Sequence, residues 1–329
     1  MKTLHSFAVT ALLATLPGAM AAVGVEDRMT RTIPVQPGGR IVLQVDNGSI
    51  EVRTADTPNI ELEVFRRVEA GSQEESARIL AEYELTVEQT GNEVSVRGAY
   101  KEGGRREYGR YLRKHHYVVI APREFNVDLT TSGGSISVGD LKGEVRGRTS
   151  GGSLQFGRVT GPIWGRTSGG SITLEGTEGN ADVRTSGGSI RIGEVRGEVA
   201  AHTSGGSIRV GRVSGKVNAV TSGGSIEVKE AGGAVDASTS GGSVTAFLLA
   251  QPQAPCRLST SGGNVHVHLK ESVGVDLDAS TGSGRVVTDF PVTVQGNLSK
   301  HALKAAINGG GPLLHLRTSG GSIHIRKAL

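Results

Sequence analysis

The sequence predicts an all-β fold, a β-solenoid in which the chain coils into stacked rungs of 18 residues. The tetrapeptide Thr-Ser-Gly-Gly occurs nine times, and its first seven copies start at intervals of 18 residues without a slip, from Thr131 to Thr239. Fifty of the 329 residues are glycine and only 4% are aromatic, which argues against an ordinary mixed globular core. A short phrase repeated at one interval is typical of stacked repeats, in which each unit packs on a near copy of itself.

Within one repeat, counted from the threonine, apolar residues recur at positions six and eight, at eleven, and at fifteen. In the copy that begins at Thr185 these residues are Ile190, Ile192, Val195 and Val199. Alternation by two is the period of a β-strand, and glycines at positions three, four, nine and thirteen mark places where the chain bends. We therefore expect three short strands and three corners per rung, with rungs about 4.8 Å apart. The serines and threonines beside the Gly-Gly pair are expected to form hydroxyl ladders along the coil.

The ends of the chain are less regular. Residues 1–22 combine one lysine, an apolar run and small residues near Ala21, the pattern of a cleaved export signal. Residues 23–129 are predicted to be an irregular, β-rich part of the solenoid, with a weak corner at 46–49 and a short helix near 72–83. Ser72 and Glu75 have the spacing of a capping box for that helix. Residues 130–329 are predicted to be the regular solenoid with irregular final rungs, including a short helix at 299–306.

The chain has one cysteine, Cys256, so an exported form could not be stabilised by an internal disulfide. We expect Cys256 to be a small buried or half-buried apolar residue, with an intermolecular disulfide as the alternative. No segment after the export signal has about 18 unbroken apolar residues, so no transmembrane helix is predicted there.

Three stretches of the sequence resemble a bacterial envelope family of unknown function whose members are regarded as candidate adhesins. They are the early "VDNGSIEV", the repeated "TSGGSI" and the ending "DFPVTVQG…INGGGPLLHLRTSGGSIHI". The resemblance runs from about Arg31 to Arg326. It implies a right-handed β-helix and a role at the cell envelope, in adhesion or stress-associated surface functions. It implies no catalytic residues.

The first candidate site is a basic segment, "YKEGGRREYGRYLRKHHY", in which guanidinium groups alternate with tyrosines. Guanidinium groups hold phosphate, sulfate or carboxylate in forked pairs, and tyrosine rings can stack on sugars. The alternative is a solvated loop between two strands, the common reading of a charge run. The residues of this candidate anion site are Arg105, Arg106, Tyr108, Arg110, Tyr111, Arg113 and Lys114.

The second candidate site is the column of residues just before successive Gly-Gly corners: Arg148, Arg166, Arg184 and His202. In a solenoid these side chains would lie about 4.8 Å apart on one outer face. Stacked like charges are unfavourable unless an acid or a bound anion lies beside them, so we expect aspartates or glutamates in the adjoining columns.

The sequence predicts no cofactor and no metal site. His266 and His268 share one face of a strand, and His324 occupies the column of His266, but no further ligand can be named. The corners carry serine where calcium-binding β-rolls carry aspartate. The "TSGGS" phrase lacks the strand-to-helix turn of a nucleophile elbow, and the outward acids show no special pair for glycoside cleavage.

The sequence therefore predicts a non-enzymatic, adhesin-like exported protein, periplasmic or secreted to the cell surface. It would present a rigid β-helical surface that binds an anionic glycan, a lipid or another envelope component. Its expected partners are anionic polysaccharide, lipopolysaccharide or another envelope protein, and not nucleic acid. Two alternatives stay open: a polysaccharide-active β-helix enzyme, and a scaffold or sensing module for envelope stress.

Overall fold

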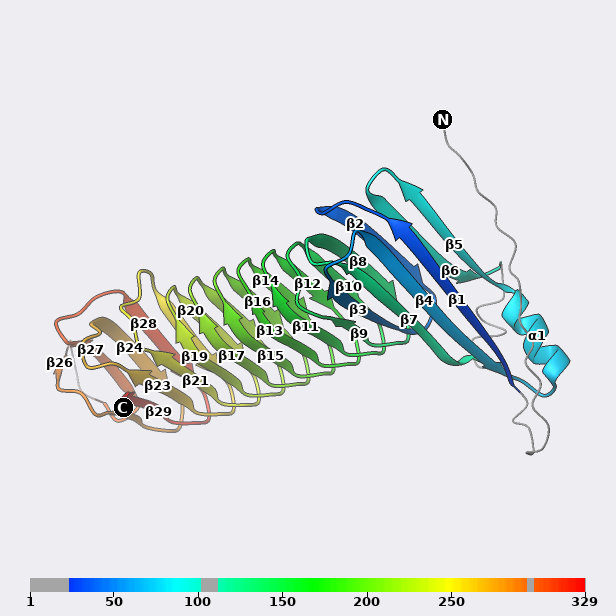
Figure 1. Ribbon diagram of the computed structural model, residues 1–329. Helices are drawn as coiled ribbons and strands as arrows, with labels where there is room; N and C mark the ends of the chain where they lie inside the picture. The colour runs from blue at the N-terminus through cyan, green and yellow to red at the C-terminus, as the bar shows by residue number, and fades with distance from the viewer. Residues whose placement is uncertain (1–23, 102–111, 295–298, 329) are drawn as a thin grey trace.

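The computed structural model describes residues 24–101, 112–294 and 299–328, and it shows a long rod built from two stacked-strand sheets (Figure 1). Sheet A has 14 strands and sheet B has 15, and in the regular part their strands are parallel. Each regular rung contributes one strand to sheet A and the following strand to sheet B. The all-β solenoid predicted from the repeat is confirmed.

The regular rungs supply most of both sheets. The sheet A strands are β9 (Ile136–Val138), β11 (Leu154–Val159), β13 (Ile172–Thr177), β15 (Ile190–Val195), β17 (Ile208–Val213), β19 (Ile226–Ala231), β21 (Val244–Leu248) and β23 (Val265–Leu269). The sheet B strands are β8 (Phe125–Thr131), β10 (Val145–Arg148), β12 (Ile163–Arg166), β14 (Ala181–Arg184), β16 (Val199–His202), β18 (Val217–Val220), β20 (Val235–Thr239) and β22 (Cys256–Thr260). Neighbouring strands are in register, so Ile190 lies beside Ile208, its counterpart 18 residues on.

Each rung has two strands, whereas three were predicted from the glycine spacing. The ladder between β15 and β17 pairs Ile190 to Ile192, skips Gly193, and resumes at Glu194 and Val195. The chain therefore bends at the ninth position without ending the strand. The handedness of the coil stays a prediction.

The interior is formed by the positions that the alternation selects. Ile190, Ile192, Val195 and Val199 are each at most 2% exposed, and their counterparts in the other rungs form one continuous core. Each side chain packs on its counterpart above and below, so a copied sequence places side chains of matching size in contact along the core.

The hydroxyl ladders also exist, but their partners are backbone groups of the neighbouring rung. The buried Thr203 donates its hydroxyl to the carbonyl oxygen of Gly188 at 2.8 Å, and the same contact recurs in the other rungs. On the outside, Ser189 Oγ accepts a hydrogen bond from the backbone N–H of Ser207 at 3.2 Å. These contacts provide hydrogen-bond partners for backbone groups at the corner, where the strand-to-strand ladders of the two sheets are interrupted.

The N-terminal part extends both sheets. Its strands are β1 (Gly24–Pro34), β2 (Gly39–Val45), β3 (Ser49–Ala55), β4 (Asn59–Glu69), β5 (Tyr83–Thr90), β6 (Glu93–Tyr100) and β7 (Leu112–Pro122). Strands β2 and β3 form a rung of the solenoid, because β2 pairs in parallel with β8 and β3 with β9. Antiparallel strands are then added: β4 pairs with β7, β1 with β4, and β5 with β6.

The predicted helix is α1 (Gln73–Ala81). Ser72 Oγ accepts a hydrogen bond from the N–H of Glu75 at 3.1 Å, as a capping box requires. The Glu75 carboxylate, however, accepts from the N–H of Gly71 at 3.0 Å, one residue earlier than that motif predicts.

A buried polar cluster lies where α1 and β1 cover the N-terminal rungs. Arg66 forms an ion pair with Asp27 and donates to the carbonyl oxygen of Tyr83 at 3.1 Å. The hydroxyls of Tyr83 and Tyr117 are 2.8 Å apart. His115 is 6% exposed and lies edge-on to the Tyr83 ring, with centroids 5.3 Å apart.

The final rungs differ from the predicted order. Their strands are β24 (Val275–Thr281), β25 (Val286–Thr288), β26 (Val292–Val294), β27 (Ala302–Ile307), β28 (Leu313–Thr318) and β29 (Ile323–Lys327). Strand β28 lies between β22 and β24, so the last copy of the repeat inserts before the altered copy that precedes it in sequence. The expected helix at 299–306 is wrong: β27 is a strand, antiparallel to β24, with Leu303, Ala305 and Ile307 buried.

Cys256 is buried and unpaired, as predicted, with its Sγ 3.4 Å from the N–H of Val235. Burial raises the pKa of its thiol. Within the described ranges, no helix has the length and apolar character to cross a membrane.

Candidate functional site: an arginine column on sheet B

The first candidate site falls largely on residues that the structure does not describe. Arg105, Arg106, Tyr108, Arg110 and Tyr111 lie outside the described residues. The backbone of Arg113 and Lys114 belongs to β7, which pairs with β4. This site stays a prediction.

The second candidate site is brought together by the ladder of sheet B. Arg148 pairs in register with Arg166, Arg166 with Arg184, and Arg184 with His202. All four residues end their strands and point away from the core, because glycine, valine or alanine at the preceding position faces inward. We call these four residues the arginine column.

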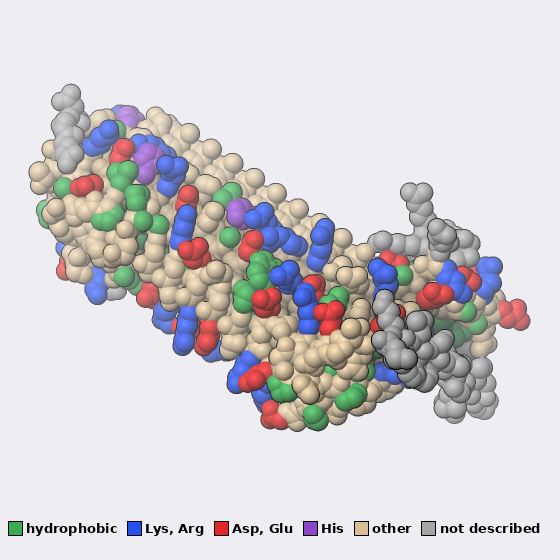
Figure 2. Space-filling view, turned by 90° about the horizontal axis from the view of Figure 1, so that it is seen from above, with side chains coloured by type: hydrophobic (Ala, Val, Ile, Leu, Met, Phe, Trp, Pro, Cys, Tyr) green, Lys and Arg blue, Asp and Glu red, His purple; other side chains and the backbone are tan. Residues whose placement is uncertain are grey.

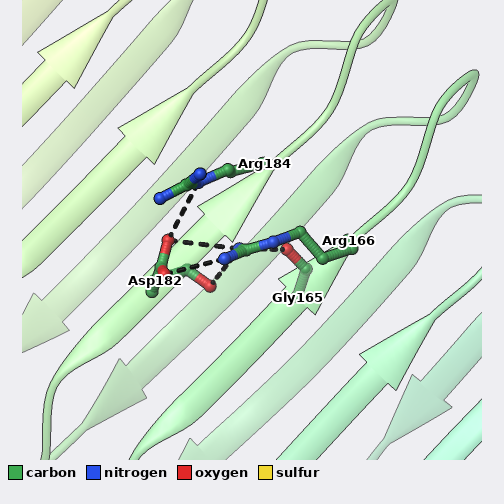
Figure 3. A network of polar contacts seen from close by, with 4 residues as sticks. All are labelled: Gly165, Arg166, Asp182 and Arg184. Carbon is green, nitrogen blue, oxygen red and sulfur yellow. Dashed lines mark hydrogen bonds and ion pairs between the residues drawn. The ribbon is translucent and has the colours of Figure 1, made fainter.

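Asp182 holds two of the arginines, as Figure 3 shows. Arg166 donates to both carboxylate oxygens of Asp182, at 3.1 and 2.7 Å, and to its carbonyl oxygen at 3.0 Å. Arg184 Nε lies 3.4 Å from the same carboxylate. Burial raises the pKa of Asp182, but the hydrogen bonds and charges of Arg166 and Arg184 outweigh it and hold that pKa below its ordinary value. An acid in the adjoining column was predicted, and Asp182 is that acid.

Arg148 differs from its two neighbours in the column. Its side chain is exposed, and within the described part of the chain no ion pair to it is found. Asp128, the acid on the adjacent strand, is paired with Arg40 at 2.9 Å. Arg148 therefore presents a guanidinium group that is open to a ligand.

Trp164 completes this face and was not identified from the sequence. It lies between Arg146 and Asp182 in the adjoining column, and the Arg146 guanidinium carbon lies 4.5 Å from the centre of its ring. The sequence did hold a signal, because the only tryptophan of the chain occupies an outward position of the repeat. Cation–π contact with Trp164 fixes one face of the ring against arginine.

His202 ends the column. Burial, followed by the charge of Arg184, lowers the pKa of His202. Its ring is therefore largely neutral at pH 7, and acidification adds positive charge to the column.

The local charge balance is positive. Four arginines (146, 148, 166 and 184) face two carboxylates, Glu144 at 3.7 Å from Arg146 and Asp182, which leaves an excess of two positive charges. The side chains of Arg166 and Arg184 are 36% and 53% exposed. Figure 2 shows charged side chains gathered along the length of the rod beside a strip that lacks them.

The same contact is repeated near the C-terminal end. Arg317 donates to the Asp278 carboxylate at 2.9 Å and to its carbonyl oxygen at 2.7 Å, and His315 lies 3.7 Å from that carboxylate. Sheet B thus repeats one contact, in which an arginine at the end of a strand forms an ion pair with an aspartate on the neighbouring strand.

The histidines considered as metal ligands do come together. The rings of His266 and His324 stack with centroids 5.1 Å apart, and His268 stacks on Phe247 at 4.3 Å. Among the described residues, no group of three or more potential ligands is arranged to hold a metal ion.

The fold defines the class of this protein: a rod-shaped β-solenoid with in-register columns of polar side chains on its outer faces. The chain belongs to the Toastrack DUF4097 family, whose family model matches residues 39–326. None of the curated proteins matches it in sequence.

Several solved structures are similar over most of their length. A candidate adhesin from Bacteroides fragilis NCTC 9343 is 12% identical, with 91% of this chain and 97% of that chain covered and a TM-score of 0.31. A candidate lipid-binding protein from Parabacteroides distasonis ATCC 8503 is 14% identical, with 92% and 97% covered and a TM-score of 0.36.

Proposed function

We propose that this protein is an exported, non-enzymatic envelope protein that binds an anionic glycan along the outer face of sheet B. The observation that carries the proposal is the in-register arginine column, of which Arg148 is exposed and without an acidic partner in the described part of the chain. The export signal expected at residues 1–22 supports the location, and lies outside the described residues.

A polymer suits this site better than a small anion. The arginines recur once per rung, so Arg148 and Arg184 are two rungs, about 10 Å, apart along the rod. A ligand with charges repeated along a chain can contact several rungs at once. Guanidinium groups bind carboxylate, sulfate and phosphate through forked hydrogen bonds, so an acidic or sulfated polysaccharide has suitable chemistry.

A glycan is favoured over a lipid surface. Among the described residues the exposed large apolar side chains are Val287, Val294 and Leu313, all in the last rungs. None of these three side chains lies near the arginine column, where the large aromatic neighbour Trp164 is half-buried and covered on one face by Arg146. Lipopolysaccharide, which offers both sugar and phosphate, is one arm of the test below.

The test is retention on immobilised heparin in low salt. We expect Arg148→Ser/Arg166→Ser/Arg184→Ser to elute at clearly lower salt than the wild type. Retention depends on ion pairs between the arginines and the heparin sulfates, which salt screens. The control is Arg191→Ser/Arg209→Ser/Arg212→Ser on sheet A, which removes the same charge from other faces. Equal elution of both triple variants would assign retention to net charge and contradict the proposal.

Two further arms separate the competing readings. The variant Arg105→Ser/Arg106→Ser/Arg110→Ser/Arg113→Ser tests the basic segment on the same heparin resin. If only this variant lost heparin retention, the binding site would be assigned to the basic segment. Binding to lipopolysaccharide-coated and phospholipid-coated surfaces is compared with binding to heparin. Release of new reducing ends from acidic polysaccharides would favour the enzyme alternative.

A further inference from the structure

A shallow hollow with several polar side chains in its lining lies on the outer face of sheet A, where the N-terminal rungs meet the regular ones. Its volume is about 310 Å³, and its lining includes Glu51, His116, Ser135, Ser137, Ser153 and Gln155. The hollow lies on sheet A and the arginine column on sheet B, so the two sites share no residues.

The ladder explains why a hollow forms there. Glu51 pairs in register with Ser137, and Ser137 with Gln155, so a short serine lies between two long side chains. The adjoining column places Ser135 and Ser153 in line with Ser49, which pairs with His116. Serine side chains therefore lie between the longer side chains of Glu51, His116 and Gln155, and Ile50 and Ile136 also contribute to the lining.

The backbone polar groups at these serines are already used. The carbonyl oxygens of Ser135 and Ser153 accept from the N–H groups of Ile50 and Ile136, both at 2.9 Å. The Oγ atoms of the same two serines accept from N–H groups of the next rung, at 3.1 and 3.2 Å. Within the described residues no acceptor is found for their hydroxyl hydrogens, which can therefore be donated to a ligand.

Glu51 supplies a fixed acceptor in the lining. Its carboxylate accepts from Arg53 Nε at 2.7 Å and lies 3.5 Å from His116 Nε2. The hydrogen bond from Arg53 is the main cause that lowers the pKa of Glu51, although burial opposes it, so the group is ionised at neutral pH. A carboxylate with two oxygens retains lone pairs for further donors.

We propose that this hollow binds a neutral sugar unit. The hollow offers several hydroxyl donors, an amide and one carboxylate acceptor, which match the mixed donors and acceptors of adjacent sugar hydroxyls. An anion would be repelled by Glu51, and a cation would find that carboxylate already neutralised by Arg53. The volume is at the small end of ligand sites, which fits one or two sugar units.

The binding should be weak, because the hollow is open and shallow. We expect dissociation constants in the millimolar range, on the order of 1 mM. Saturation-transfer difference NMR detects such binding. The probes are methyl glycosides of glucose, galactose, mannose and N-acetylglucosamine, with lactose and maltose as neutral disaccharides.

We expect saturation transfer to at least one of these probes with the wild type. Ser137→Phe fills the hollow from an outward strand position and should abolish the transfer, and Glu51→Gln should weaken it several-fold. Thr245→Phe, at the same position of a distant rung, is the matched control and should leave it unchanged. Thermal unfolding of each variant verifies folding.

No transfer with the wild type, or equal transfer with Ser137→Phe, would overturn the inference. The triple serine variant of the arginine column provides the separation from the proposed function. It should lose heparin retention and keep sugar transfer, whereas Ser137→Phe should do the reverse.

Discussion

Gly206 lies so close to Gly188 in the preceding rung that a Cβ placed on Gly206 would be 2.2 Å from the Gly188 carbonyl oxygen. The same close approach recurs at the fourth position of the other regular rungs, for example 2.1 Å at Gly188 and 2.3 Å at Gly224. The corner is therefore packed backbone on backbone, and only glycine fits there.

Replacing Gly206 by alanine should destabilise the solenoid strongly. The added methyl group must displace backbone of the neighbouring rung, which we expect to cost about 3 kcal/mol or more of the free energy of unfolding. Gly205→Ala is the control, because its Cβ would meet the nearest atom at 3.1 Å. Denaturant unfolding measures both, and equal losses would contradict this account of the corner.

Neutralising Asp182 should strengthen anion binding. Asp182→Asn removes the carboxylate that holds Arg166 and Arg184, so both guanidinium groups become available to a ligand. We expect elution from heparin at higher salt than for Glu84→Gln, which makes the same charge change on β5. If the two variants elute at the same salt concentration, Asp182 does not limit the access of anions to Arg166 and Arg184.

The buried His115 should make stability depend on pH. Burial, followed by the charge of Arg66, lowers the pKa of His115 to about 4. The unfolded chain, with the ordinary value of about 6.5, binds a proton that the folded protein excludes. The free energy of unfolding should therefore fall as the pH is lowered from about 6.5 toward 4, by at most about 1.4 kcal/mol per pH unit.

The variant His115→Phe should flatten this dependence between pH 6.5 and 5, where few carboxylates titrate. His116→Gln is the control, since that side chain lies on the outer face. The free energy of unfolding is measured by chemical denaturation at a series of pH values. An equal decrease per pH unit in His115→Phe and the wild type would contradict this role of His115.

The repeat period was sufficient to predict the core and the outer columns. Once positions six and eight are assigned to the interior, residues that are 18 positions apart must share the same orientation in successive rungs. This periodicity places four residues in one column: Arg148, Arg166, Arg184 and His202. The acid beside them was also expected, because stacked like charges need one.

Other features depend on tertiary contacts that the period does not contain. The skipped Gly193 bends a strand without ending it, so the number of strands per rung was overestimated. Residues 302–307 have good helix formers, but antiparallel pairing with β24 and burial of alternate residues override that preference. The insertion of β28 between β22 and β24 reverses the sequence order of two rungs, and no local signal marks it.

Trp164 offers the most direct measurement of the central claim, because it is the only tryptophan and lies beside the arginine column. Fluorescence of the wild type is titrated with a heparin-derived oligosaccharide in low salt. We predict a saturable change in emission that high salt suppresses and that Arg148→Ser/Arg166→Ser/Arg184→Ser removes. An unchanged emission during binding, or a full response in the triple variant, would contradict a glycan site on this face of sheet B.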